Sequence, residues 1–547
     1  MIASSDPVAA NLRRRGGESM HQTPHSRRAQ IALLRRSSQS PPAGSTGPSG
    51  TISCQCGREG SLGRCRGTEP NPDDMVMNIM HEKQTGAMTP SPERRLQTQN
   101  AATGSRHWTK VAGVVAAGLV VTVALIAGVT PHLPPVSATF AGDIRKIAAA
   151  VVFAGSYLAL ALGKIPGLSI DRAGVALVGA SLMVASGTLS PAEAYQAVDL
   201  DTITLLLGTM IVVASLRLSG FFAIVTTWVL DHAKRPSVLL CAVTATSGLF
   251  SAFLVNDAIC LVLAPLVLEL TRRMGRQPLP YLLAVAMASN VGSTATITGN
   301  PQNIMIGSFS RIPYRTFAET LGPVALAGLA ITVGLVFLLH RQEFTGGTTL
   351  TEAKSRIRVN RVLVARALLA TAAMIVLFFA GQPPAEAAIV IGALLLLTRR
   401  VKSERVYAEI DWSLLLMFAG LFIIVAGAQR ALLTPDVTAA VGHLHLDQVP
   451  ILSLVTAALS NLVSNVPAVL MLKPFVAPLA NHDIAWLTIA MASTLAGNFT
   501  VLGSIANLIV VRQAEARGVQ ISFWDYFRVG APLTVITLVI GTLWLWL

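Results

Sequence analysis

The chain has 547 residues, of which 52% are hydrophobic and only 13% are charged, whereas soluble domains carry about 25% charged residues. This composition excludes an ordinary soluble protein and places most of the chain in a membrane. The net charge of +14 does not indicate nucleic-acid binding, because the Lys and Arg residues are scattered through short loops and a tail instead of lining one face.

The first 107 residues are rich in Arg, Ser, Gly, Pro and Gln and lack apolar periodicity. Such a segment buries too little apolar surface to offset the entropy of ordering, so we predict a disordered cytoplasmic tail over 1–107. Its cysteines, Cys54, Cys56 and Cys65, have no His or fourth Cys at zinc-finger spacing. We therefore expect no metal site and no cofactor other than a transported or coupling ion.

The rest of the chain divides into an additional span, two halves and a linker. We predict an extra transmembrane helix at 108–130, a first repeat at 140–340, a cytoplasmic linker at 341–361 and a second repeat at 362–547. The apolar elements expected within the repeats are 146–163, 171–189, 203–216, 237–254, 257–273, 281–310, 317–340, 362–380, 385–398, 411–429, 448–463, 466–480, 485–511 and 529–547. The amphipathic stretches Gly220 to His232 and Ala431 to Leu446 are typical of helices that lie along the membrane interface.

An internal repeat relates the two halves. AMASNVGSTATITGNPQNI, from Ala286, aligns with AMASTLAGNFTVLGSIANL, from Ala490, and SAFLVNDAICLVLAPL, from Ser251, aligns with SNLVSNVPAVLMLKPF, from Ser460. The resulting matches are Gly299 with Gly503, Asn303 with Asn507, Asn256 with Asn465, Pro265 with Pro474, and Asp201 with Asp411. The offsets run from 204 to 210 residues and drift only where linkers differ in length.

Loop charge predicts the orientation of the spans. With the tail in the cytoplasm, most Lys and Arg residues fall on the cytoplasmic side, including Lys164 and Arg172 between the first two spans of the first half. The polar sequences LVNDA and VSNVP lie midway along two apolar stretches, which favours hairpins that enter and leave the membrane on one side. Full crossings in their place would give the same parity, so the re-entrant hairpins rest on these polar tips alone.

Each half then crosses the membrane five times, an odd number, and the halves have opposite orientations, as in the inverted repeats of many secondary transporters. We predict an all-α polytopic membrane protein with two inverted-topology repeats, each with five membrane crossings, a re-entrant hairpin and an interrupted helix. The N-terminus is expected in the cytoplasm and the C-terminus outside.

The repeated polar segments are the candidate site. Irregular backbone at membrane depth persists only where it is buried in protein or lines a water-filled cavity, and helices opened there present carbonyls to a cation or N-termini to an anion. The alternative, that small residues only allow close helix packing, does not explain the repeated amides. The candidate binding residues are Asn256, Asp257, Ser293, Thr294, Thr298, Gly299, Asn300, Asn303, Ser464, Asn465, Asn498, Thr500, Gly503 and Asn507.

Two ionisable side chains at membrane depth have open roles, since such groups are costly and are functional candidates. Asp257 has no acidic counterpart, because Val466 occupies its position in the second half. It is our coupling candidate as a proton carrier, and the alternatives are that it binds a cation or caps the second hairpin helix. Lys473, beside Pro474, is either an anion ligand or the partner of a carboxylate.

Together, FLVNDAICLVLAPLVL and SNVGSTATITGNPQNIMI resemble the ion transporter superfamily, in particular the branch that holds the arsenite permeases and citrate-metal symporters. The resemblance spans about 140–547. The chain is also similar to the divalent anion:sodium symporters, whose dicarboxylate carriers have Ser-Asn-Thr at each hairpin tip. Here the tips read Val255-Asn256-Asp257 and Ser464-Asn465-Val466, so the Asn is kept, but the missing Thr argues against dicarboxylates. The resemblance implies a homodimer in which hairpins and opened helices move against a scaffold.

These observations predict a secondary active transporter and no enzyme, because no span carries HExxH and no GxxxxGKS/T motif for ATP coupling occurs. We expect it to move a small inorganic or organic anion, or an oxyanion such as arsenite, across the cell inner (cytoplasmic) membrane by alternating access. The partners would be that anion, a coupling proton or sodium ion, the lipid bilayer and a second copy, but no nucleic acid. Two alternatives stay open: a sodium/proton antiporter, and a membrane sensor or scaffold that does not transport.

Overall fold

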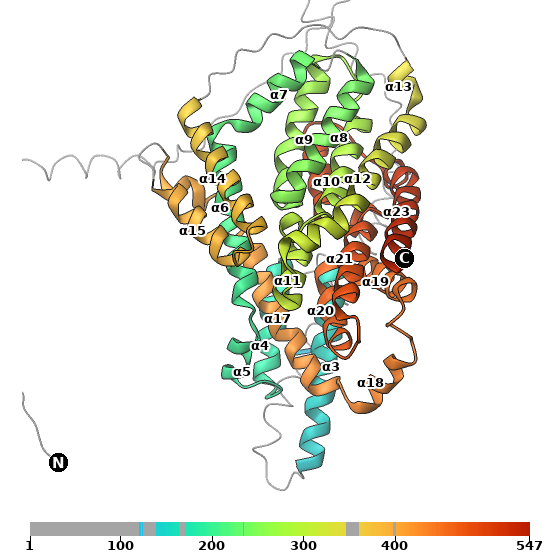
Figure 1. Ribbon diagram of the computed structural model, residues 1–547. Helices are drawn as coiled ribbons and strands as arrows, with labels where there is room; N and C mark the ends of the chain where they lie inside the picture. Colours follow the sequence, from blue (N-terminus) through green and yellow to red (C-terminus); the bar gives the residue numbers. More distant parts are fainter. Residues whose placement is uncertain are drawn as a thin grey trace, which may run out of the picture. The chain divides into compact units, whose positions relative to one another are not determined.

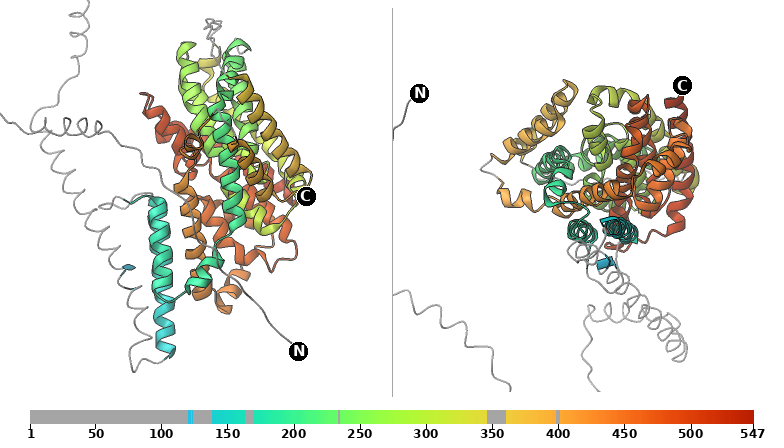
Figure 2. Two further views of the ribbon diagram at one scale, coloured as in Figure 1. Left: turned by 90° about the vertical axis from the view of Figure 1, so that its left-hand side faces the viewer. Right: turned by 90° about the horizontal axis from the view of Figure 1, so that it is seen from below.

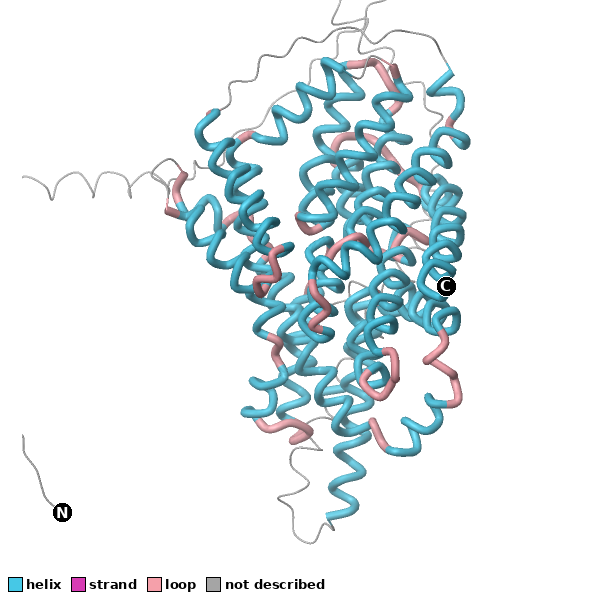
Figure 3. The backbone as a smooth tube through the Cα atoms, in the orientation of Figure 1, coloured by secondary structure: helices cyan, strands magenta, loops and turns pink. Residues whose placement is uncertain are grey.

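The computed structural model of the chain describes residues 120, 121, 123, 138–162, 170–232, 235–345, 360–397 and 401–547. The tail predicted at 1–107, with its three cysteines, and most of the helix predicted at 108–130 lie outside these residues. Within the described ranges every regular element is a helix and no strand occurs (Figure 3). All of them belong to one compact unit, Pro90–Leu547.

The helices follow the apolar segments of the sequence (Figure 1). In chain order they are α3 (Ala138–Leu162), α4 (Arg172–Ala185), α5 (Pro191–Ala197), α6 (Leu200–Ser219), α7 (Phe221–His232), α8 (Pro236–Phe253), α9 (Asn256–Arg273), α10 (Pro278–Ser293), the 3-10 turn η2 (Ile297–Gly299), α11 (Pro301–Ser310), α12 (Tyr314–Leu339), α13 (Arg341–Thr345), α14 (Arg361–Phe379), α15 (Pro384–Leu396), α16 (Ser403–Tyr407), α17 (Trp412–Leu432), α18 (Pro435–Gly442), α19 (Val449–Val463), α20 (Asn465–Val476), α21 (His482–Ala496), η3 (Val501–Gly503), α22 (Ile505–Glu515) and α23 (Phe523–Trp546).

Seven of the described helices are long and apolar enough to cross a membrane, namely α3, α6, α8, α12, α14, α17 and α23. The structure also confirms that both predicted polar interruptions break a helix, since η2 divides α10 from α11 and η3 divides α21 from α22. The short helices α5, α13 and α16 were not predicted. The amphipathic stretch Ala431 to Leu446 holds only α18, because Thr434 caps a new helix there by accepting from the Val437 N–H, with Pro435 at its first position.

The same order of elements occurs twice around a polar centre. α10 packs against α8, α9 and α12, and α21 packs against α19, α20 and α23. Each group also contacts helices of the other, because α22 packs on α9 while α11 packs on α20 and α21. In Figure 1, α7 and α18, which follow corresponding long helices, lie at opposite ends of the helical unit. The core is therefore shared by both halves.

Helix caps correct one detail of the sequence alignment. Asp411 is the N-cap of α17, where its carboxylate accepts from the Leu414 N–H. The residue in the corresponding place before α6 is Asp199, which accepts from the Thr202 N–H, whereas Asp201 lies inside the first turn. The match of Asp201 with Asp411 was therefore wrong by two residues, and the offset in this region is 212.

The first helices of each half pack against the long helix of the other half. α4 and α3 lie on α17, and α15 and α14 lie on α6 (Figures 1 and 2). Two glycines allow this approach: a Cβ on Gly208 would lie 2.5 Å from the backbone carbon of Ala388, and a Cβ on Gly420 would lie 2.6 Å from that of Ala176. Both contacts repeat at the offset of 212, so the swapped packing follows one pattern in both halves.

Candidate functional site

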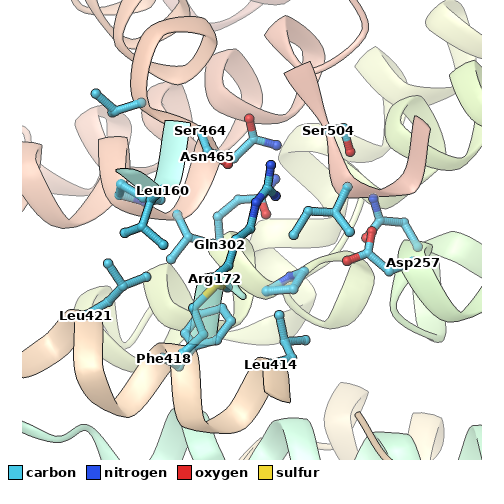
Figure 4. A pocket seen from close by; sticks show the side chains of 17 residues that line it. Leu160, Arg172, Asp257, Gln302, Leu414, Phe418, Leu421, Ser464, Asn465 and Ser504 are labelled. Atoms are coloured by element: carbon cyan, nitrogen blue, oxygen red, sulfur yellow. The ribbon is translucent and has the colours of Figure 1, made fainter. Parts of the chain in front are cut away.

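Residues of both halves line one cavity of about 560 Å³, a volume that includes its open mouth. One wall comes from α3, α4 and α17 and is apolar except for Arg172, and the other holds the two hairpin tips and the starts of α11 and α22 (Figure 4). The lining residues are Leu160, Arg172, Asn256, Asp257, Pro301, Gln302, Leu414, Met417, Phe418, Leu421, Val463, Ser464, Asn465, Val466, Pro467, Ser504 and Ile505.

Besides α4, whose first residue is Arg172, four helices contribute their N-terminal ends to the cavity. These are α9, α11, α20 and α22, of which α11 and α22 begin after Asn300 and Ser504 in extended conformation. The first N–H groups of a helix have no partner within it, and the aligned peptide dipoles place about half a positive charge at that end. Four such ends together make a favourable environment for an anion.

Ser464 holds an unusual conformation at the tip of the second hairpin. Its φ of 82° and ψ of 158° fall in a region that glycine occupies almost alone, at a cost of about 1–3 kcal/mol for other residues. The sharp turn leaves a single residue, Ser464, between the end of α19 and the start of α20, and this residue lines the cavity. Such strain is found where a site needs a fixed geometry.

Two amides fasten the opened segments in the same way in both halves. The Asn303 side chain donates to the carbonyls of Ser293 and Thr296, at 3.1 and 3.0 Å. Asn507 donates to the carbonyls of Gly497 and Thr500, the matching residues, at 2.8 and 3.2 Å. The repeated Asn that the sequence singled out therefore clamps the chain where each helix opens.

Asn290, which we did not predict as a site residue, joins the first hairpin to the second opening. Its amide nitrogen donates to the side-chain oxygens of Asn498 at 2.9 Å and Asn507 at 3.0 Å. Its oxygen accepts from the Asn256 amide at 2.9 Å and from the Ser504 hydroxyl at 3.0 Å. With only 1% of its surface exposed, Asn290 is the centre of a buried hydrogen-bond network.

Thr494, the counterpart of Asn290 in the repeat, has the reciprocal role. Its hydroxyl accepts from the amides of Asn300 at 3.1 Å and Gln302 at 3.2 Å. With the Asn465 amide oriented so that both its polar atoms are paired, Asn465 donates to the Gly503 carbonyl and accepts from Gln302, each at 3.2 Å. Each opening is thus bound to the helix that precedes the opening in the other half, α21 for the first opening and α10 for the second.

Among the described residues the cavity has one basic side chain, Arg172, which we did not predict as a site residue. Loop charge placed Arg172 with the cytoplasmic loops, whereas it is the first residue of α4 and reaches into the cavity toward Gln302 and Asn465 (Figure 4). No side chain of the described residues makes a hydrogen bond or ion pair with its guanidinium. Lys473 instead lies outside the cavity, with its Nζ 3.7 Å from the centre of the Phe309 ring.

Among the described residues, Asp257 is the only acidic one that lines the cavity. It is the second residue of α9, after Val255 as the N-cap, so it does not occupy the capping position. Its carboxylate faces the N–H of Ala506 in α22 and interacts across space with Arg172. It also borders a second cavity of about 640 Å³, which is lined by Asp411, among others. One carboxylate therefore faces both spaces.

One polar atom at the hairpin tip has no partner. The side chain of Asn256 is 3% exposed, and its Oδ1 is buried without a hydrogen bond among the described residues. A buried acceptor left unpaired costs about 1–3 kcal/mol, so a ligand that donates a hydrogen bond there gains affinity. Among the described residues, no group of three or more His, Cys, Asp or Glu lies where it would hold a metal ion.

The predicted site residues fall into two layers. Asn256, Asp257, Ser464 and Asn465 line the cavity. The others lie behind it in the opened segments: Ser293, Thr294, Thr298, Gly299, Asn300, Asn303, Asn498, Thr500, Gly503 and Asn507. The repeat alignment offered a signal for Ser504, which matches Asn300, and Gln302 stood in the same polar segment. Nothing in the sequence indicated Arg172, because a charge at a helix start is usual beside a loop.

Comparisons with known proteins find similarity to membrane transporters. A family model described as "Citrate transporter" matches residues 157–496, more than half of the chain. The silicon efflux transporter of Oryza sativa subsp. japonica is 29% identical over 469 residues, which cover 73% of this chain and 97% of the relative. An uncharacterized transporter of Mycobacterium tuberculosis is 29% identical over 430 residues, 74% of this chain and 98% of the relative.

Two further proteins are more distant. A Dictyostelium discoideum protein with the transporter name arsB is 23% identical over 490 residues, which cover 68% of this chain and 87% of the relative. Among solved structures, the Alcanivorax borkumensis YdaH transporter matches with a TM-score of 0.44 and 16% identity, over 62% of this chain and 83% of that one.

Proposed function

The chain belongs to the citrate transporter family within the ion transporter superfamily, as its two motifs indicated, and on this premise we propose that it is a secondary active transporter of a small anion or oxyanion. The observation that carries the proposal is the convergence of four helix N-termini and the Arg172 guanidinium on one cavity. Cations and positive dipole ends in a site of low dielectric attract an anion far more strongly than they would in water.

The hydrogen-bonding groups of the cavity favour an oxyacid. The helix N-termini, Arg172 and the Gln302 amide donate, whereas the unpaired Asn256 Oδ1 and the Asp257 carboxylate accept. A partly protonated oxyanion presents oxygens to the first group and a hydroxyl to the second. The relative named as a silicon efflux transporter supports this class, and citrate, from the family description, remains in the panel of candidates.

Coupling would reside at Asp257. An ionised carboxylate in the same cavity repels an incoming anion and competes with it for Arg172, and a proton or a sodium ion on Asp257 removes both effects. Anion binding and cation binding therefore assist each other, which is the thermodynamic requirement for coupled transport. The second cavity, which also borders Asp257, brings this carboxylate within reach of water from another direction.

Alternating access would use the two halves as inverted repeats. The repeated element order and the swapped packing of α4 on α17 and α15 on α6 support two related arrangements of similar energy. In such proteins one bundle moves against the other around a fixed site. We place α8 to α12 and α19 to α23 in the moving bundle, because both networks of buried amides lie within them.

Uptake into proteoliposomes tests the proposal. Purified full-length chain is reconstituted, and the uptake of arsenite, silicate, sulfate and citrate is measured with proton and sodium gradients imposed separately. We expect concentrative uptake of at least one probe under one gradient, and its loss in Asp257→Asn. Asp201→Asn, an exposed residue in the first turn of α6, is the matched control and should keep wild-type uptake.

Three different outcomes would each contradict a part of the proposed function. Sodium flux tied to proton flux with no anion movement would favour an antiporter. A wild-type chain that moves none of the probes under either gradient would refute transport of this class of anion. Sodium-driven uptake that is indifferent to the proton gradient would refute a proton-carrying role for Asp257.

A further inference from the structure

The cavity lies between two helix bundles that differ in polarity. Its polar wall comes from the hairpin tips and opened helices, which share the buried amide networks. Its other wall comes from α3, α4 and α17, which pack on one another and contribute Leu160, Leu414 and Phe418 among apolar residues. Within the part of the chain that the structure describes, Arg172 is the only charged residue on this second wall of the cavity. An anion bound here therefore touches both bundles at once, through Arg172 on one side.

The other half has no equivalent of Arg172. The register fixed by Asp199 with Asp411 and by Gly208 with Gly420 relates α4 to α15. Arg172 is the first residue of α4, and the first residue of α15 is Pro384. Proline supplies neither charge nor an N–H, so the matching position has no group that binds an anion.

We propose that Arg172 binds the transported anion only in the conformation described here, so that the site has a higher anion affinity when it faces one side of the membrane than when it faces the other. The inference rests on the proposed function. In inverted repeats the opposite-facing state exchanges the roles of the halves, so α15 and α6 surround the site there instead of α4 and α17. The polar wall travels with the anion, whereas the guanidinium stays behind.

The consequence is a difference in anion affinity between the two sides of the membrane. A guanidinium that donates to a bound oxyanion in a partly buried site improves affinity by about tenfold or more. Loss of this contact during the conformational change weakens binding just before the anion leaves on the opposite side. Arg172 thereby sets the difference between uptake and release affinities, while the helix N-termini supply the part that both states share.

Half-saturating concentrations measured from both sides test this inference. Right-side-out and inside-out vesicles with the full-length chain are given arsenite, silicate, sulfate and citrate over a concentration series. We expect Arg172→Gln to raise the half-saturating concentration at least about tenfold from one side and less than about twofold from the other. Arg172→Lys, which keeps the charge but not the planar fork of donors, should fall between. Lys473→Gln removes a cation that lies outside the cavity, over the Phe309 ring, and should leave both sides unchanged.

A reciprocal variant guards against a purely structural effect. Pro384→Arg places a guanidinium at the start of α15, and we expect it to lower the half-saturating concentration from the side that Arg172→Gln leaves unaltered. Elution as one symmetric peak on size exclusion confirms folding of each variant.

Equal changes from both sides in Arg172→Gln, or no change from either side, would overturn the inference while leaving transport intact. A wild-type chain that moves none of the four probes would instead contradict the proposed function, and this inference with it.

Discussion

Asn290 is the residue whose loss should destabilise the polar centre most. Asn290→Ala removes the partners of Asn256, Asn498, Ser504 and Asn507 at once. The Ser504 hydroxyl lines the cavity and is solvated again, but three buried amide atoms are left without good partners. At about 1–3 kcal/mol for each orphaned group, with some relaxation by entering water, we expect the free energy of unfolding to fall by about 3–6 kcal/mol.

Pulse proteolysis of purified chain in mixed micelles across a denaturant series measures this loss. The control is Thr209→Ala, a fully buried hydroxyl that bonds only to carbonyls of its own helix, whose removal leaves no orphaned group and costs about 1 kcal/mol. Asn290→Asp should be at least as harmful as Asn290→Ala, because it turns an oxygen toward the oxygens of Asn498 and Asn507. If Asn290→Ala lost no more stability than Thr209→Ala, the network would not hold the halves together.

Three further outcomes follow from the packing, the site and the charges. Gly208→Ala should lower the free energy of unfolding by about 1–3 kcal/mol through overpacking, measured by the same proteolysis, whereas Gly322→Ala, with open space around it, should be neutral or stabilising; equal effects would contradict the close approach. Thr298→Val should keep the half-saturating concentration for uptake, because this hydroxyl pairs with a buried tyrosine, whereas Gln302→Ala should raise it about tenfold; the reverse order would contradict the assignment of the cavity wall. Hydrogen bonds from the Ser190 backbone and then the Arg430 side chain lower the pKa of Glu193 from 4.5 to about 2. The stabilisation of α5 by ionised Glu193 is therefore present above pH 4.5 and lost as the pH falls toward 2. Acid should increase proteolytic nicking at α5 in the wild type but not in Glu193→Gln, and identical acid sensitivity of the two chains would contradict this.

Hydropathy and the internal repeat were sufficient to predict most helices of the described part. Long apolar segments have few alternatives to a helix in a membrane, and the two polar segments could be recognised as interruptions because they recur in register. The short helices α5 and α16 could not be predicted, since a few polar residues form a helix only when caps and tertiary contacts support it. Residues at the shared offset of 204 proved equivalent in their hydrogen bonds, as Asn303 and Asn507 show.

The site itself was only partly predictable. The hairpin residues could be found because a polar side chain in the middle of an apolar segment is costly in a membrane and is therefore a functional candidate. Many of the other predicted residues, such as Thr298 and Asn303, hold the backbone of the openings, and a sequence cannot separate a residue that binds a ligand from one that binds the loop beside it. Arg172 was assigned to a loop because counting charges between apolar segments does not show whether the first residue of a helix lines a cavity.

The position of a bound oxyanion tests the central claim most directly. Crystals of the full-length chain grown with arsenate, a tetrahedral oxyanion whose arsenic scatters anomalously, would locate it without assumptions about transport. The account predicts one arsenic peak in the cavity between the hairpin tips, within hydrogen-bond reach of Arg172 and of the backbone N–H of Gln302 in α11 or of Asn465 in α20. A peak beside Lys473 instead, or a cavity without arsenic at saturating arsenate, would contradict it.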